Sequence, residues 1–224
     1  MTHIRGMNDV HAEFIAHLSQ TDPILCHQVR ANGPLELPDA DPHFRALCRA
    51  IIGQQLSTKA AHTIFTRFWN WVEMTLPMTQ ISEEHPTALA ERIVRASPEE
   101  LRAVGISAQK ATYLMAMSQA WLKDSATFLQ LDQLSDAQVV DVLCSVKGIG
   151  EWTAQMFLIF TLKRPDVFAP GDLGIKKAIE HLYGVPMASS RQVFEAHAAN
   201  WSPHRSLACL HLWRTSDALQ RQPK

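Results

Sequence analysis

Residues 146–153, Val-Lys-Gly-Ile-Gly-Glu-Trp-Thr, lie between two stretches with helical patterns. Apolar residues recur at helical spacing from Val139 to Val146, and a wholly apolar run, residues 156–160, follows. Two glycines one residue apart weaken any helix that runs through them, but they permit a sharp turn and the close approach of another group. The sequence therefore predicts a tight hairpin, in which one helix ends near Val146 and the next begins near Glu151.

The second helix of this hairpin offers a site for an anion. The amides of its first turn have no partner within the helix, and the positive end of the helix dipole lies beside them. A phosphate could bind there with little help from charged side chains. The alternative is an ordinary turn between two helices, since glycine pairs are common turn residues.

Helix signals recur along the whole chain, whereas strand signals are almost absent. Residues 44–51 carry apolar side chains at the i, i+3, i+4 and i+7 positions of an amphipathic helix. Capping boxes at 97–100, 135–138 and 189–192 indicate where further helices begin. The chain is therefore predicted to be all-α, with about ten helices.

The division into packing units follows from the turn residues. Asn, Gly and Pro cluster at 32–42, which is typical of a crossover between two packing units. We expect one compact protein of two helical lobes. The first lobe is residues 42–145, and the second is residues 1–41 with 146–224, beginning with the hairpin 146–151.

Length, charge and cysteine content narrow the class. The chain has 224 residues and a formal net charge of -1, so it lacks the basic character of many nucleic-acid-binding proteins. The segment 42–72 nevertheless carries four basic residues and no acidic one, which permits a DNA-binding surface. The four cysteines are far apart and fit no Cys-x-x-Cys metal pattern. Because no apolar signal core or bilayer-length run is present, we expect a soluble intracellular protein.

Asp172 is the candidate catalytic residue. It lies 22 residues beyond Gly150, directly after Ala169-Pro170-Gly171 and before an amphipathic helix, where it is placed to act as an N-cap. A carboxylate at a helix N-terminus is favoured in its ionised form by the amides and the dipole. An ionised carboxylate stabilises the cationic sugar that forms when a glycosidic bond breaks, so the two roles are compatible.

A Gly-x-Gly hairpin followed by a Gly/Pro-rich turn and an aspartate resembles the helix-hairpin-helix superfamily of DNA base-excision glycosylases. Three segments are similar to its alkylation-repair branch, the DNA-3-methyladenine glycosylase II type. They occur in family order and read RAIIGQQLSTKAA (Arg49–Ala61), VKGIGEWTAQMFLIFTLKRPDVFAPGDLGIKKAI (Val146–Ile179) and WSPHRSLACLHLWR (Trp201–Arg214). The resemblance covers roughly residues 40–216. It implies a two-lobed all-α fold with an active-site cleft between the lobes.

The resemblance also implies an activity. Asp172 would be the catalytic carboxylate, which stabilises the developing sugar cation and helps to position or deprotonate the attacking water. Strand-cleaving relatives carry a lysine nucleophile two residues after the second hairpin glycine, where this chain has Trp152. We therefore expect a monofunctional enzyme without lyase activity. It would hydrolyse alkylated purines, such as 3-methyladenine and 7-methylguanine, from DNA and leave an abasic site.

The base pocket implied by the resemblance contains Trp152, Met156 and Trp213. The two tryptophans match aromatic positions of the alkyl-purine branch, and electron-rich ring faces attract a cationic alkylated base. Met156 and Arg214 stand where a tyrosine can occur in relatives, which leaves the substrate range open. The alternative for each tryptophan is packing in the core.

Contacts with DNA are implied at two places. Extruding a base leaves a gap in the duplex, and the family loop that fills it matches residues 53–56. Gln55 is the expected wedge, with Leu56 as the alternative and a simple capping amide as the structural reading. The phosphates are expected to meet Lys147, Gly148, Ile149, Gly150 and Thr153.

No cofactor is expected to be required. By resemblance, the backbone carbonyls of Cys144, Val146 and Ile149 are candidate ligands for a structural Na⁺ or K⁺. The iron-sulfur branch of the family needs four closely spaced C-terminal cysteines, and only Cys209 lies in that region, so we expect no cluster. We expect a monomer that acts on double-stranded DNA with alkylated bases and binds no membrane. It would work in the bacterial cytoplasm (nucleoid) or in the eukaryotic nucleus.

Two other functions remain open from the sequence. A helix-hairpin-helix protein that only binds DNA needs the hairpin amides but no carboxylate 22 residues later. A glycosylase for oxidised or mismatched bases is the other alternative. Trp152 argues against its lyase types, and the missing cysteines argue against its cluster-bearing types.

Overall fold

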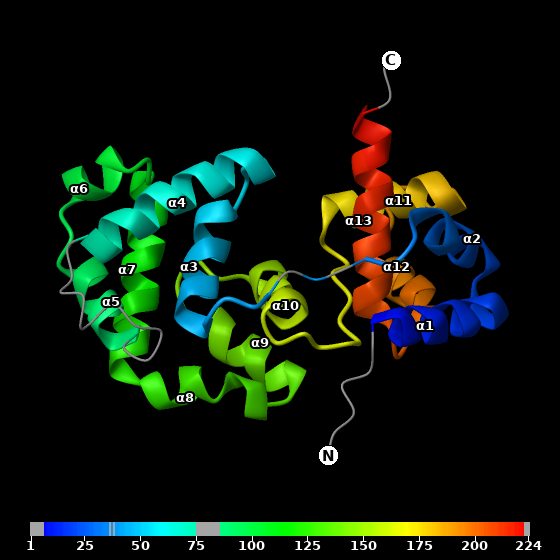
Figure 1. The fold of residues 1–224 in the computed structure, drawn as a ribbon, viewed down its shortest axis with the longest axis horizontal. Helices are drawn as coiled ribbons and strands as arrows, with labels where there is room; N and C mark the ends of the chain where they lie inside the picture. The colour runs from blue at the N-terminus through cyan, green and yellow to red at the C-terminus, as the bar shows by residue number, and fades with distance from the viewer. Residues whose placement is uncertain (1–6, 36, 38, 75–85, 222–224) are drawn as a thin grey trace. The chain divides into compact units, whose positions relative to one another are not determined.

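The computed structural model describes residues 7–35, 37, 39–74 and 86–221. Within these ranges the chain forms thirteen α-helices, two short 3-10 helices and no β-strand, which confirms the predicted all-α class (Figure 1). The number exceeds the ten expected, and a helix as short as α8, with 5 residues, holds too few residues to show a period. None of the described helices is long and apolar enough to cross a membrane.

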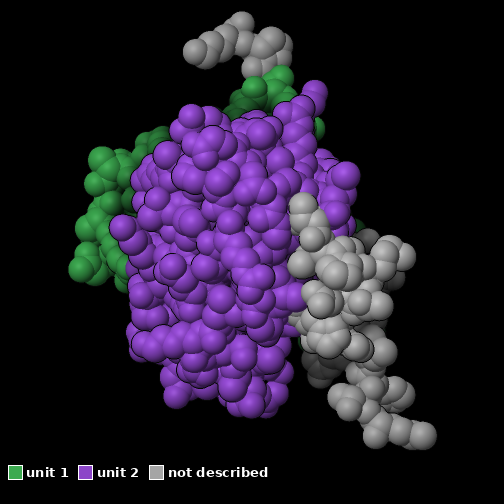
Figure 2. Space-filling model, turned by 90° about the vertical axis from the view of Figure 1, so that its left-hand side faces the viewer, with its two compact units in different colours: residues 1–38, 163–224 green, residues 39–162 purple. Residues whose placement is uncertain are grey.

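The chain divides into two compact units, which are coloured in Figure 2. Unit 1 comprises Met1–Pro38 and Lys163–Lys224, and unit 2 comprises Asp39–Leu162. Unit 2 contains α3 (His43–Gly53), α4 (Thr58–Met74), α5 (Pro86–Val94), α6 (Pro98–Ala103), α7 (Ala108–Lys123), α8 (Ser125–Leu129), η2 (Leu131–Gln133), α9 (Asp136–Cys144) and α10 (Glu151–Phe160). Unit 1 contains α1 (Met7–Thr21), α2 (Pro23–Asn32), α11 (Leu173–Tyr183), α12 (Arg191–Ala198), η3 (Ala199–Trp201) and α13 (Arg205–Arg221).

Helix α3 is the centre of unit 2. It packs against α4, α7 and α10. The apolar face predicted for it is confirmed, because Phe44, Leu47, Cys48 and Ile51 are all buried. The ring of Phe44 lies edge-on to that of Trp121 on α7, with 5.0 Å between the centroids. Burial of these side chains stabilises α3 within unit 2, since each large apolar side chain contributes about 1.5–3 kcal/mol.

The boundary between the units differs from the expected one. The sequence assigned the hairpin and the following helix to the lobe of residues 1–41 and 146–224, but residues 146–162 belong to unit 2. The reason is packing: α10 lies against α9 and α3, and its Phe157, Leu158 and Ile159 are buried. An apolar run shows that a helix is buried, but it does not show which neighbours bury it.

The helix caps agree with the sequence in two of three cases. Ser97 and Ser135 each form a complete capping box at the start of α6 and α9. The third predicted position is wrong, because α12 begins at Arg191 with Ser190 as its N-cap and no side-chain cap hydrogen bond.

Unit 1 is held together by α11 and α13, which pack along each other. Its largest fully buried side chain is Trp201, whose indole donates a 2.7 Å hydrogen bond to Asp22. Tyr183 at the end of α11 donates to the same carboxylate at 2.7 Å. This arrangement fixes the C-terminal end of α11, and the candidate residue Asp172 lies at its N-terminal end.

Candidate active site and nucleic-acid interface

The predicted hairpin forms in unit 2 as a turn between α9 and α10. Helix α9 ends at Cys144, Gly148 has a φ of 94°, and Gly150 is the N-cap of α10. No side chain caps α10 within the described residues, and there the amides of Gly148 and Gly150 have no hydrogen-bond acceptor. The hairpin therefore presents open backbone donors at the positive end of a helix, which suits a phosphate.

The structure requires a glycine at only one of the two hairpin positions. Gly148 has a backbone conformation that L side chains rarely adopt, and a Cβ there would overlap the ring of Tyr113 on α7. Gly150 has an ordinary extended conformation (φ -103°), and a Cβ there would meet nothing within 4 Å. Packing within unit 2 therefore explains Gly148, whereas the space beside Gly150 is open to another molecule.

The side chains around the hairpin do not all face the solvent. Lys147 is exposed, and Trp152 keeps 39% of its surface exposed. Met156 is half-buried one turn further along α10. Thr153 is buried, and its hydroxyl accepts a 3.2 Å hydrogen bond from Gln54, so only its backbone could meet DNA. Ile149 is buried as well, so its predicted contact is also restricted to the backbone.

The predicted wedge loop follows α3 in the same unit. Gln55 is exposed and has a positive φ of 57°, and Leu56 is also exposed. The side chain between this loop and the hairpin is Gln54, which the sequence analysis did not single out. Its amide donates to the Gly148 carbonyl oxygen at 2.9 Å as well as to Thr153. No sequence pattern marks this bond, because its partners are 94 and 99 residues away.

The candidate cation ligands lie at the end of α9 and in the turn. The Val146 carbonyl accepts a 3.0 Å hydrogen bond from the Ile149 amide, while those of Cys144 and Ile149 accept none within the described residues. Carbonyl oxygens suit a hard cation, so the donor chemistry fits Na⁺ or K⁺. Burial, and then the nearby Glu151 and Asp141, raise the pKa of the Cys144 thiol. The described residues contain no group of His, Cys, Asp and Glu side chains that could hold a metal.

Much of the basic character of the segment 42–72 is neutralised within the chain. The guanidinium groups of Arg45 and Arg49 both pair with Asp41, at 3.1 and 2.6 Å. The Arg49 guanidinium also lies 4.1 Å from the centre of the Phe65 ring. Of the four basic residues, only Lys59 and Arg67 remain as exposed charges outside these pairs, so this segment offers less to DNA than its charge count suggests.

Asp172 lies in unit 1 and is the N-cap of α11, which confirms the structural role predicted for it. Its Oδ1 accepts two hydrogen bonds of 2.9 Å, one from the Ile175 amide and one from the indole nitrogen of Trp213 on α13. The carboxylate is half-buried. Hydrogen bonds to a carboxylate fix its orientation.

Trp213 therefore orients the candidate catalytic carboxylate, a contact that the sequence did not reveal. The close approach depends on Gly174, where a Cβ would lie 3.2 Å from both Asp172 Oδ1 and Trp213 Cδ1. Trp213 is half-buried and the neighbouring Arg214 is exposed. The signal in the sequence was Gly174 inside the first turn of a helix, a position where glycine is unfavourable unless packing requires it.

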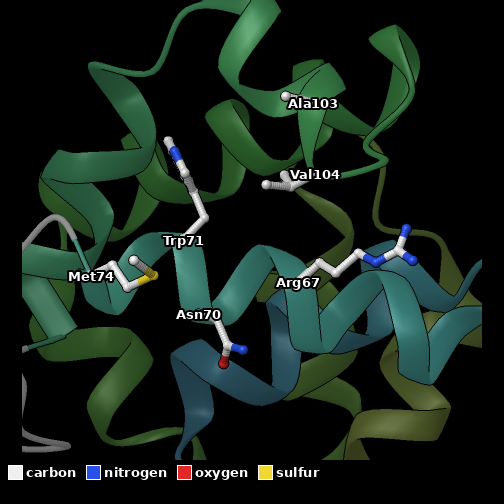
Figure 3. Close-up of a pocket in the computed structure, with 6 residues that line it drawn as sticks. All are labelled: Arg67, Asn70, Trp71, Met74, Ala103 and Val104. Carbon is white, nitrogen blue, oxygen red and sulfur yellow. The ribbon is translucent and has the colours of Figure 1, made fainter.

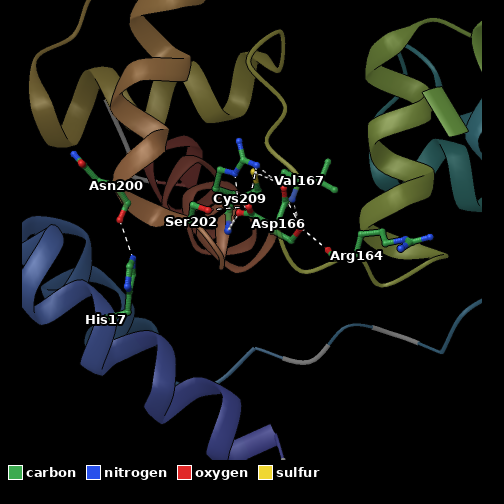
Figure 4. A network of polar contacts seen from close by, with 9 residues as sticks. His17, Arg164, Asp166, Val167, Asn200, Ser202 and Cys209 are labelled. Carbon is green, nitrogen blue, oxygen red and sulfur yellow. Dashed lines mark hydrogen bonds and ion pairs between the residues drawn. The ribbon is translucent and has the colours of Figure 1, made fainter. Parts of the chain in front are cut away.

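The segment before Asp172 is attached to the start of α13 (Figure 4). The Ser206 hydroxyl donates to the Arg164 carbonyl at 2.6 Å and accepts from the Val167 amide at 3.0 Å. Asp166 accepts hydrogen bonds from Arg205 at 2.7 and 2.9 Å. Burial acts to raise the pKa of the Asp166 carboxyl, but its hydrogen bonds with Arg205 and Ser202 outweigh this and lower it. Helix α13 thus holds both ends of the segment that carries Asp172.

A separate hollow of about 480 Å³ lies in unit 2 (Figure 3). Its lining includes none of the predicted site residues. The guanidinium of Arg92 lies 4.0 Å from the centre of the Trp71 ring and pairs with the Glu100 carboxylate at 2.6 Å. The hollow is lined by Arg67, Asn70, Trp71, Met74, Ala103 and Val104.

The hairpin, the half-exposed tryptophan and the carboxylate at a helix N-terminus are the features of a DNA-processing enzyme of one class. The profile of the HhH-GPD superfamily of base excision DNA repair proteins matches residues 48–204, a range that includes the predicted wedge loop, the hairpin and Asp172. The chain therefore belongs to the HhH-GPD superfamily of base excision DNA repair proteins, and its relatives place it in the alkylation-repair branch.

Three comparisons illustrate the similarity. DNA-3-methyladenine glycosylase 1 of Schizosaccharomyces pombe is 33% identical over 174 residues, which are 77% of this chain and 72% of that protein. A structure of a Schizosaccharomyces pombe 3-methyladenine DNA glycosylase in complex with abasic DNA has a TM-score of 0.75 and 29% identity, covering 94% of this chain and 100% of that chain. For a DNA-3-methyladenine glycosidase from Bacillus halodurans the TM-score is 0.74 at 29% identity, with 95% and 91% covered.

Proposed function

We propose that the protein is a monofunctional DNA glycosylase that extrudes alkylated purines from double-stranded DNA and hydrolyses their glycosidic bonds. The observation that carries this proposal is the Asp172 carboxylate, which Ile175 and Trp213 hold at the N-terminus of α11. A protein that only binds DNA would need the open amides of the hairpin, but it would have no use for an oriented carboxylate in this position.

The chemistry requires little beyond this carboxylate. Breaking the glycosidic bond gives the sugar a partial positive charge, which a nearby negative charge stabilises. Purines alkylated at N3 or N7 carry a positive charge and are good leaving groups, so a strong general acid is not needed. The exposed ring of Trp152, with the half-buried Met156 one turn further along α10, would attract such a base through a cation–π interaction.

The relatives support the same substrate class. Several are named DNA-3-methyladenine glycosylases, and the Schizosaccharomyces pombe enzyme has been solved with abasic DNA, the product of base removal. We infer that this chain also takes 3-methyladenine, 7-methylguanine and related bases, and that it leaves an abasic site as a monomer, without a required cofactor. A Na⁺ or K⁺ on the carbonyls of Cys144, Val146 and Ile149 would be structural.

The test is base release by the wild type and by Asp172→Asn on methylated duplex DNA. The amide keeps the size of the side chain and an oxygen for the N-cap, but it removes the charge. We expect single-turnover release of 3-methyladenine to fall at least a hundredfold, as for the loss of one preorganised electrostatic contact at a reacting centre. Equal release by both proteins would contradict the catalytic role of Asp172. Tight binding of methylated DNA without any release would favour a binding protein.

A second arm of the same assay tests the absence of lyase activity. Lyases form a Schiff base between a lysine or terminal amine and the sugar, and borohydride traps this adduct. Because Trp152 occupies the position of the family lysine, we expect no trapped adduct between the wild type and abasic DNA. A trapped adduct, or strand cleavage before alkali treatment, would contradict the monofunctional mechanism.

A further inference from the structure

Gln54 connects two segments of unit 2 that are expected to contact DNA, the predicted wedge loop and the hairpin. It is the residue that follows α3, and its side chain lies half-buried between the loop of residues 53–57 and the hairpin. Its Nε2 donates to the Gly148 carbonyl oxygen at 2.9 Å and to the Thr153 hydroxyl at 3.2 Å. A backbone carbonyl can only accept, so the amide nitrogen must face Gly148.

The loop has a second attachment at its start. The Nζ of Lys110 on α7 donates a 2.6 Å hydrogen bond to the Ile52 carbonyl oxygen at the end of α3. Partial burial lowers the pKa of this lysine, and a cation at a helix C-terminus is favoured by the helix dipole. Tyr113, one turn along α7, packs against Gly148 of the hairpin. One face of α7 therefore supports both the loop and the hairpin.

The conformation of the loop shows why it needs these attachments. Gln55 has a positive φ of 57°, a conformation that is unfavourable for a residue with a side chain and persists only where the surroundings hold it. The Leu56 amide closes the turn with a 3.2 Å hydrogen bond to the Gly53 carbonyl. Gln55 and Leu56 are left exposed at the tip, while Gln54 points inward.

We propose that Gln54 is a positioning residue for base extrusion: it fixes the exposed tip of the loop relative to the hairpin, so that wedge insertion and phosphate binding occur at a set distance. This inference rests on the proposed function, because it takes the tip as the segment that fills the gap in the duplex. The phosphate remains bound by the hairpin amides, which Gln54 does not cover. Loss of the Gln54 hydrogen bonds to the hairpin therefore impairs base extrusion more than it impairs DNA binding.

The experiment compares Gln54→Met, which keeps the length of the side chain but has no donor, with the wild type. Binding of undamaged duplex DNA is measured by fluorescence anisotropy, and extrusion by the fluorescence of 2-aminopurine stacked beside the target nucleotide. We expect binding to stay within about twofold and the extrusion equilibrium to fall about tenfold, the effect of losing a buried hydrogen bond. Single-turnover release of 3-methyladenine should fall by a similar factor.

Matched variants distinguish the loss of the Gln54 hydrogen bonds from a general loss of stability. Gln130→Met replaces an exposed glutamine of the same unit and should leave both measurements unchanged. Thr153→Val removes one of the two acceptors and Thr153→Ser retains it, so extrusion should fall in the first and recover in the second. If Gln54→Met does not fold, the two Thr153 variants still test whether the hydrogen bond from Gln54 supports extrusion. Equal losses in binding and extrusion, or wild-type extrusion by both Gln54→Met and Thr153→Val, would overturn the inference.

The outcomes also separate this inference from the proposed function. If the wild type extrudes the base but releases none, the glycosylase proposal fails while the role of Gln54 is still measured by extrusion. If release depends on Asp172 but Gln54→Met extrudes and releases normally, the glycosylase proposal stands and the role of Gln54 is refuted.

Discussion

The N-termini of α10 and α11 both present backbone amides at the positive end of a helix, but the two helices differ in what caps them. Helix α10 begins at Gly150 with no side-chain cap in the described structure, and helix α11 begins at Asp172, whose own carboxylate accepts from the Ile175 amide. The first therefore leaves room for an external anion, while the second carries an anion of its own. One kind of helix terminus is thus suited both to an external anion and to a carboxylate of the chain itself.

The neighbouring aromatic residues follow the same division. Tyr113 packs against Gly148 and shapes the turn, but it leaves the amide of Gly150 open. Trp213 donates directly to the carboxylate at the other terminus and fixes its orientation. Substitutions at these positions test each half of the comparison separately.

The largest effect is expected from Gly148→Ala in the hairpin. Alanine is disfavoured at a φ of 94°, and its Cβ would overlap the Tyr113 ring, so we expect unit 2 to lose about 3 kcal/mol of stability. Thermal unfolding followed by circular dichroism measures this loss, and DNA binding should weaken with it. A stability equal to that of the wild type would show that the turn is not fixed by Tyr113.

An intermediate effect is expected from Trp213→Phe, which keeps an aromatic ring but removes the hydrogen bond to Asp172. Single-turnover release should fall about tenfold, the usual effect of losing one hydrogen bond to a charged group. Equal decreases for 3-methyladenine and 7-methylguanine would indicate positioning of the carboxylate. A decrease for only one base would instead place the main role of Trp213 in the base pocket. Trp71→Phe, in the separate hollow, is the control and should retain wild-type release.

The smallest effect is expected from Gly150→Ala at the open terminus. Because its conformation suits any residue and, apart from its two chain neighbours, no atom of the described residues lies within 4 Å of the added Cβ, stability should change by less than about 1 kcal/mol. The methyl group would crowd a phosphate bound at the amides, so we expect the Kd for duplex DNA to rise about threefold at low salt. The measurement is a titration over a range of salt concentrations. An unchanged Kd would show that no phosphate approaches Gly150.

The sequence predicted the helical class, the hairpin and the carboxylate because each depends on neighbouring residues. The apolar spacing in α3, the capping boxes at Ser97 and Ser135, and the N-cap at Asp172 are all local patterns, and the structure confirms them. The assignment of Asp172 to catalysis came from the resemblance and stays a prediction. The sequence assigned residues 146–162 to the other packing unit, because an amphipathic or apolar pattern does not show which helices a segment packs against.

By itself, then, the sequence determined the helical class, the hairpin and the N-caps at Ser97, Ser135 and Asp172, since backbone propensity and capping act over a few residues. Only the tertiary structure decided that Trp213 orients Asp172, that Tyr113 requires Gly148, and that Gln54 ties the loop to the hairpin. These contacts join residues 35 to 94 positions apart. The burial of apolar helix faces brings them together, and that packing leaves no periodic mark on the residues that it places in contact.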